Sequence, residues 1–99
     1  MEVIGTVFLK VEYTPTGEIL ETTFNLEERE HGVSYLWVIK GKNGNLIAAR
    51  GNGIDQRVLK PENKLQQIFE HALYNINNYL LGRKRIFKVI EFRLVPTGT

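Results

Sequence analysis

The sequence predicts an α+β domain in which one long helix packs on one face of a five-stranded antiparallel sheet. Two patterns predict this fold class. Apolar residues recur every three or four positions over residues 61–81, which is the period of a helix. Five other stretches are rich in alternating apolar and β-branched residues, which is typical of strands. The element order is therefore β-β-β-β-α-β.

The first two strands are predicted to form a hairpin. Residues 3–12 alternate apolar and polar side chains, and residues 18–26 do the same on the return. Between them, residues 14–17 read Thr-Pro-Thr-Gly, which places proline and glycine where a tight turn uses them.

The third and fourth strands are predicted to form a second hairpin. Residues 33–40 are apolar at nearly every position, which is typical of a strand with neighbours on both sides. The pair Asn43-Gly44 is a strong hairpin signal, and residues 45–50 form the returning strand. We expect residues 27–32 and 51–57 to be loops, because both are polar and contain glycine.

The helix is predicted over residues 61–81. Pro61 suits the first helical turn, and Gly82 suits a left-handed exit from the last turn. Gln67, His71 and Asn75 follow one another at four-residue spacing on the polar side, so we expect a row of solvated hydrogen-bonding groups there.

A fifth strand is predicted over residues 86–95, lying beside the first in the order 5-1-2-3-4. Residues 1–99 then form a single domain, which agrees with the usual size of one.

The widths of the two layers do not match. Five strands at about 4.8 Å spacing span roughly 20–25 Å, whereas a helix is about 10 Å wide. We therefore expect the helix to cover part of one face and the chain to form a homodimer, either through the other face of the sheet or by pairing of edge strands. The predicted interface residues are Ile4, Phe8, Leu36, Val38, Ile47, Phe87 and Val89. The alternative is a strongly coiled sheet that closes on itself.

The composition favours binding over catalysis. There is no cysteine, which excludes disulfides, thiolate nucleophiles and zinc sites that need sulfur. His31 and His71 have no partner ligand at metal-binding spacing, and Ser34 is the only serine. We expect no enzyme activity, no metal and no cofactor. The first residues carry acidic and basic side chains and resemble no export signal, so we expect a cytoplasmic protein.

Charge is divided unevenly along the chain. Residues 1–30 hold seven acidic and two basic residues, a net −5, and the remainder holds four acidic and eleven basic residues, a net +7. A basic sheet with aromatic residues can bind single-stranded nucleic acid. We therefore predict single-stranded DNA or RNA as the partner. The predicted contacts are Lys40, Lys42, Arg50, Arg57, Arg83, Lys84, Arg85 and Lys88.

Two alternatives remain open at this point. The first is a protein-interaction or inhibitor module, which would dock a partner through the uncovered sheet face and the acidic stretch Glu27–Glu30. The second is a small anion site at the start of the helix, where Arg57, Lys60 and Lys64 would add to the positive end of the helix dipole.

Overall fold

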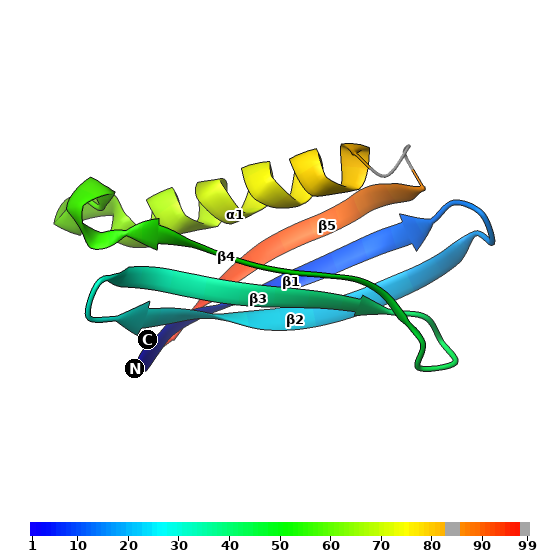
Figure 1. Ribbon diagram of the computed structural model, residues 1–99, viewed down its shortest axis with the longest axis horizontal. Coiled ribbons are helices and arrows are strands. Elements are labelled where there is room, and N and C mark those ends of the chain that lie inside the picture. The colour runs from blue at the N-terminus through cyan, green and yellow to red at the C-terminus, as the bar shows by residue number, and fades with distance from the viewer. Residues whose placement is uncertain (83–85, 98–99) are drawn as a thin grey trace.

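The computed structural model describes residues 1–82 and 86–97 and has the predicted α+β architecture (Figure 1). The elements are β1 (Glu2–Tyr13), β2 (Glu18–Arg29), β3 (Gly32–Lys40), β4 (Leu46–Asp55), α1 (Lys64–Leu81) and β5 (Phe87–Pro96). All neighbouring strands are antiparallel and lie in the order β4-β3-β2-β1-β5. The predicted strand order is confirmed.

Two segments predicted as loops are parts of strands. β2 continues to Arg29 and turns into β3 through Glu30 and His31 alone, with Arg29 paired to Gly32. β4 likewise continues through Gly51-Asn52-Gly53 to Asp55. Pairing with β3 holds both segments in the sheet, because each backbone group gains a partner that a loop would lack. The acidic stretch is therefore a strand end rather than an independent loop.

The ends of the helix also differ from the prediction. Pro61–Asn63 forms a 3₁₀ turn, and α1 begins at Lys64. Gln67 fixes this approach, since its Oε1 accepts from the Lys60 N–H at 2.6 Å and its Nε2 donates to the Val58 carbonyl at 3.2 Å. Gly82 has φ −64° and ψ −14°, so it stays right-handed and does not form the predicted left-handed exit.

The helix touches both edges of the sheet. The Asn52 side chain of β4 donates to the Asn75 side chain of α1 at 2.9 Å, and the ring of Phe92 on β5 lies 4.8 Å from the ring of Phe69 on α1. A flat sheet would hold β4 and β5 roughly 19 Å apart, so contact with both edges requires strong coiling. Because the sheet curves around the helix (Figure 1), the helix covers more of this face than the predicted flat sheet would allow, although Arg50 of β4 on this face stays exposed.

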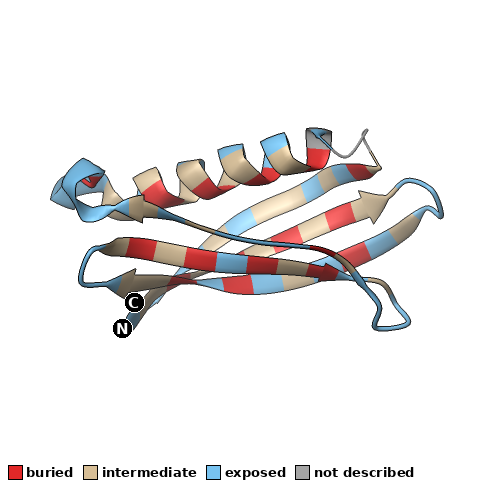
Figure 2. Cartoon of the chain, in the orientation of Figure 1, coloured by how far each residue is buried: buried red, intermediate tan, exposed pale blue. Residues whose placement is uncertain are grey.

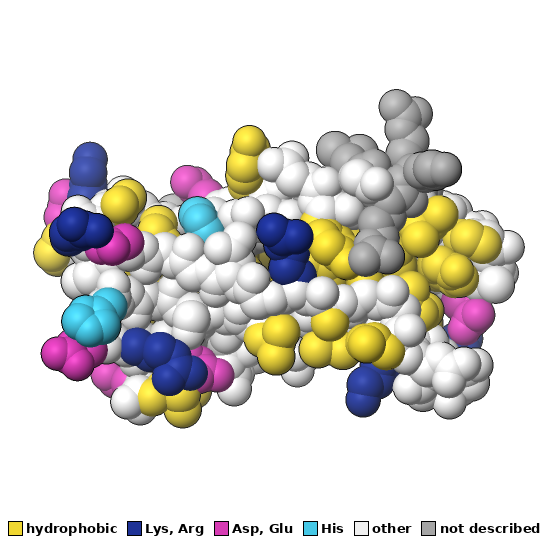
Figure 3. Space-filling view, viewed as in Figure 1, with side chains coloured by type: hydrophobic (Ala, Val, Ile, Leu, Met, Phe, Trp, Pro, Cys, Tyr) yellow, Lys and Arg dark blue, Asp and Glu magenta, His cyan; other side chains and the backbone are white. Residues whose placement is uncertain are grey.

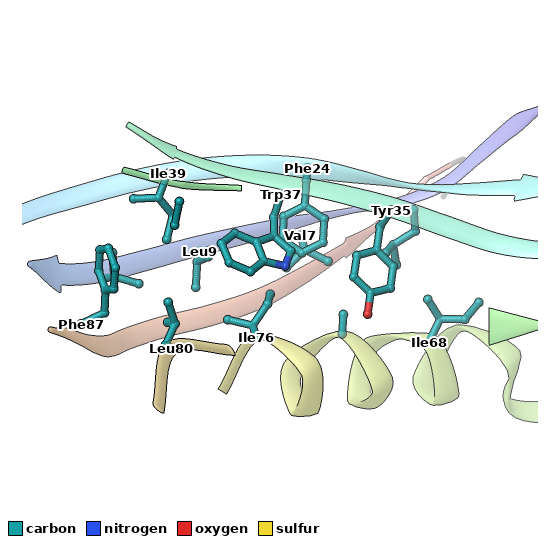
Figure 4. Close-up of a cluster of buried hydrophobic side chains, with 14 of the residues drawn as sticks. Val7, Leu9, Phe24, Tyr35, Trp37, Ile39, Ile68, Ile76, Leu80 and Phe87 are labelled. Carbon is teal, nitrogen blue, oxygen red and sulfur yellow. The ribbon is translucent and has the colours of Figure 1, made fainter. Parts of the chain in front are cut away.

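One core fills the space between the helix and the concave face (Figures 2 and 4). Trp37 lies at its centre without solvent exposure, and the Tyr79 ring of α1 meets it edge-on at 5.0 Å. Ile68, Ala72 and Ile76 supply the buried side of the helix. Burying one such isoleucine fully stabilises the fold by about 1.5–3 kcal/mol.

Three β-bulges change which residues face the core. The pairing skips Ile4 in β1, Ile47 in β4 and Ile90 in β5. An extra residue in one strand reverses the facing of the residues beyond it. Phe87 consequently is buried and Val89 packs against the core, instead of lying on the uncovered face as predicted.

The face of the sheet opposite the helix, the uncovered face, carries fewer apolar side chains than predicted. Ile4 and Ile47 are partly buried and pack against the core, as Phe87 and Val89 do, so these four do not line that face. Phe8, Leu36 and Val38 alternate with core residues and keep their predicted placement. Leu36 is 59% exposed, and Phe8 lies beneath the Arg93 guanidinium, 5.1 Å from its ring centre.

Candidate functional site

The predicted nucleic-acid contacts do not gather on one surface within the described residues. Lys40 and Lys42 lie at the β3–β4 turn, whereas Arg57 lies near the start of α1, at the opposite end of the molecule (Figure 1). Lys88 is on β5, beside Glu12 of β1. Figure 3 shows basic side chains scattered over the visible face, several of them next to acidic ones. Arg83, Lys84 and Arg85 lie outside the described residues.

The cations near the helix start already have partners. Arg57 forms a bidentate pair with Asp55 at 3.0 and 3.1 Å, and this pair lowers the pKa of Asp55 to about 2. Lys64 forms an ion pair with Glu28 across the interface of α1 and β2. Two of the three cations proposed for an anion site are thus neutralised by carboxylates of the chain itself.

Arg50 has a different environment. It projects from β4 toward the covered face, since it pairs with Trp37, whose side chain is in the core. Its guanidinium lies over the Tyr79 ring at 5.5 Å from the ring centre. Among the described residues, Arg50 forms no ion pair, although Arg29, Arg57 and Arg93 all do.

A groove opens between β4 and the second half of α1. Arg50 lines it from the strand, and Asn75, Asn78 and Tyr79 line it from the helix, around a volume of about 310 Å³. The helical spacing of three and four residues brings these three side chains to one side of α1. The groove therefore combines a guanidinium, two amides and an aromatic ring along the edge of the sheet.

Hydrogen bonds close the groove at one end. The bond from Asn52 to Asn75 ties β4 to α1, and Asn75 also donates to the His71 carbonyl at 2.8 Å. Beyond it, the Tyr35 hydroxyl lies 3.1 Å from Nδ1 of His71. Burial raises the pKa of Tyr35 to about 12 and lowers the pKa of His71. At neutral pH both groups are therefore uncharged, and the tautomer of His71 decides which of the two donates this hydrogen bond.

This network corrects the predicted solvated row on the helix. Gln67, His71 and Asn75 are each partly buried, and they bond to the strand and turn beside them. The sequence pattern gave the correct spacing, but it contained no information on which element would pack against that side. Asn52, Asn78 and Tyr79 were not among the predicted site residues, since amide and phenol side chains occur on many solvated helices and turns.

β4 has a free edge along this groove. The N–H of Gln56 donates to the carbonyl of His31 at 2.8 Å, at the end of the β3–β4 ladder. Bonded and non-bonded pairs alternate along an antiparallel ladder. In the observed register the non-bonded positions include Ala49, Gly51 and Gly53, whose backbone N–H and C=O groups therefore point away from β3, although the Gly53 N–H already donates to Oδ1 of Asn52 at 2.8 Å.

The two edge strands differ in how open they are to another strand. β5 carries a bulge at Ile90, ends at Pro96 and includes Lys88, Glu91 and Arg93, all features that discourage strand addition. In β4 the outward-bonding positions are alanine and glycine, which leave room for a neighbouring backbone. β4 also has a bulge, at Ile47, but it has no proline, so it is the more accessible edge of the sheet.

The described part of the chain has no group of three or more His, Cys, Asp or Glu side chains arranged to hold a metal ion. None of its helices has both the length and the apolar character needed to cross a membrane.

Comparison with known proteins gives no family for this chain. No protein-family model, no curated protein and no solved structure matches it.

Proposed function

We propose that this chain is a protein-interaction module that binds an extended segment of a partner protein along the free edge of β4. The bound segment would add a strand beside β4 and lie in the groove between that strand and α1. The observation that carries the proposal is the difference between the two sheet edges: β5 ends in a proline and carries three charged side chains, whereas β4, although it has a bulge at Ile47, has only alanine and glycine at its outward-bonding positions. Natural sheets rarely leave a long edge open without use.

Strand addition suits the residues of β4. Backbone groups at Ala49 and Gly51 would supply hydrogen bonds that do not depend on the partner's sequence. The small side chains at these positions would let the partner backbone approach to the usual strand spacing. Leu36 and Leu46, 59% and 64% exposed on the uncovered face, offer apolar contacts to alternate side chains of the segment.

Nucleic-acid binding is the less favoured function. It needs cations that converge along one path, and those of the described residues lie at opposite ends and on different strands. The homodimer through the uncovered face stays a prediction, which light scattering over a range of concentrations would test. Its support is reduced because that face includes the ion pairs Lys10–Glu21 and Glu91–Arg93.

The test is Ala49→Pro, with Ala49→Ser as its matched control. Proline removes an N–H that points away from β3, so the ladder should survive while strand addition is blocked. A display library of random ten-residue peptides is selected on the wild-type protein, and the enriched peptides are measured by fluorescence anisotropy. We expect Ala49→Pro to weaken binding at least tenfold and Ala49→Ser to change it less than threefold.

Other outcomes would overturn the proposal. Peptides that bind the folded proline variant as well as wild type would show that the edge is not used, and failure to enrich any peptide would count equally against it. Labelled single-stranded DNA and RNA are measured in parallel at low and moderate salt. Tight, steeply salt-dependent binding that Ala49→Pro leaves unchanged would favour nucleic acid instead. Circular dichroism melts confirm that each variant is folded.

A further inference from the structure

We infer that Arg50 selects the partner segment by binding a carboxylate, and this inference rests on the proposed function. Arg50 is the one charged side chain that β4, all of which is described, directs toward the covered face. It lies near the middle of the strand, so any segment long enough to pair with β4 would pass it.

The geometry of neighbouring strands in a sheet predicts where the carboxylate of the partner segment would lie. Residues opposite each other in neighbouring strands point to the same face, with Cβ atoms about 4.5–5.5 Å apart. The partner residue beside Arg50 would therefore point toward α1. It would enter the groove formed by Arg50, Asn75, Asn78 and Tyr79. A volume of about 310 Å³ accommodates an acidic side chain or the end of a chain.

The charge of the groove favours an anionic group there. Arg50 has no carboxylate partner among the described residues, its guanidinium lies over the Tyr79 ring, and the residue lines the groove. A planar guanidinium can bind both oxygens of a carboxylate. The Asn78 side chain is exposed beside it and can add an amide donor. Arg50 and Asn78 are both exposed, so the contribution of the pair depends on bidentate geometry rather than on burial.

The Asn52–Asn75 bond limits how far a segment can run. It joins β4 directly to α1 two residues beyond Arg50, on the same face of the strand. A chain lying inside the groove therefore has to rise out of it or end near that point. The carboxylate can then come from an acidic side chain or from the C-terminus of the partner, and the two sources share the same contact with Arg50.

The experiment repeats the peptide selection on Arg50→Gln and Arg50→Glu, with Lys40→Gln as the control for loss of one exposed positive charge. Peptides selected on wild type are expected to carry Asp or Glu at one favoured position. Changing that residue to Asn or Gln should weaken binding to wild type at least tenfold. The same peptide change should alter binding to Arg50→Gln less than twofold. Arg50→Glu should select Lys or Arg at that position, and Lys40→Gln should behave as wild type.

Synthetic peptides with free or amidated C-termini distinguish the two sources of the carboxylate. If amidation of the C-terminus weakens binding tenfold and replacement of the acidic side chain does not, the carboxylate that binds Arg50 is the C-terminus. If only replacement of the acidic side chain weakens binding, it is the side chain. Peptides that bind wild type, lose binding with Ala49→Pro and show no preference for a carboxylate would overturn this inference and leave the proposed function standing. Peptides insensitive to Ala49→Pro would overturn the proposed function itself.

Discussion

Gly32→Ala is expected to reduce the free energy of unfolding by about 3–5 kcal/mol, near the upper end for a single substitution. Gly32 follows the two-residue turn between β2 and β3 and has φ +156°, a conformation that residues with a side chain rarely adopt. A Cβ atom added there would lie 2.1 Å from the Ile54 carbonyl oxygen of β4. The turn and the β3–β4 ladder cannot both keep their positions around that atom.

Gly44→Ala is the matched control for this prediction. Gly44 also has a positive φ, +86°, but an added Cβ would meet no atom within 4 Å. Gly44→Ala should therefore reduce the free energy of unfolding only by the strain of the left-handed backbone, about 1–2 kcal/mol. Urea unfolding followed by far-ultraviolet circular dichroism measures both variants. Equal losses for Gly32→Ala and Gly44→Ala would contradict the close contact between the turn and β4.

Ile76→Ala is expected to cost about 2–5 kcal/mol, the range for removing a buried isoleucine side chain. Ile76 has no exposed surface and lies between α1 and the concave face of the sheet (Figure 4). The substitution leaves a cavity in a layer that the helix, Trp37 and the strands share. Helix propensity opposes the effect slightly, because alanine is a better helix former than isoleucine.

Tyr74→Ala on the same helix provides the comparison. Tyr74 is 67% exposed, so its loss should change the stability by about 0.5 kcal/mol or less. Thermal melts and urea titrations of the two variants give the difference. Similar values for Ile76→Ala and Tyr74→Ala would mean that the helix does not cover the sheet as described.

The sequence was sufficient to predict the fold class and the strand order, because both depend on periodicity and turn residues. Alternation of apolar residues located all five strands, and the turn sequences at 14–17 and 43–44 located two hairpins. The coiling of the sheet was harder to predict. It results from the summed twist of five strands around a helix, and no single residue encodes it.

The bulges explain why the two faces of the sheet were predicted less well. Alternation assigns faces correctly until an extra residue interrupts the ladder. Ile90 is such a residue, and it turns Phe87 and Val89 toward the core while remaining 48% exposed itself. Ile47 has the same role in β4. An isoleucine at a bulge looks like any other strand residue in a sequence, so the pattern contained no warning.

The candidate groove could not be predicted for a related reason. Arg50 was predicted as one cation among eight, and its position over Tyr79 depends on the register of β3 with β4 and on the contact between β4 and α1. Asn52 was assigned to a loop, although it is the residue that ties the edge strand to the helix. Contacts between separate elements decide both roles.

Amide hydrogen exchange, followed residue by residue in the labelled protein, tests the open edge of β4 most directly. In the free protein, the N–H groups of Ala49 and Gly51 should exchange at least tenfold faster than those of Arg50 and Asn52, which bond to β3. A selected peptide at saturating concentration should slow the exchange of the Ala49 and Gly51 N–H groups to the rates of those of Arg50 and Asn52. Slow exchange at Ala49 and Gly51 in the free protein, or unchanged fast exchange in the complex, would contradict strand addition at this edge.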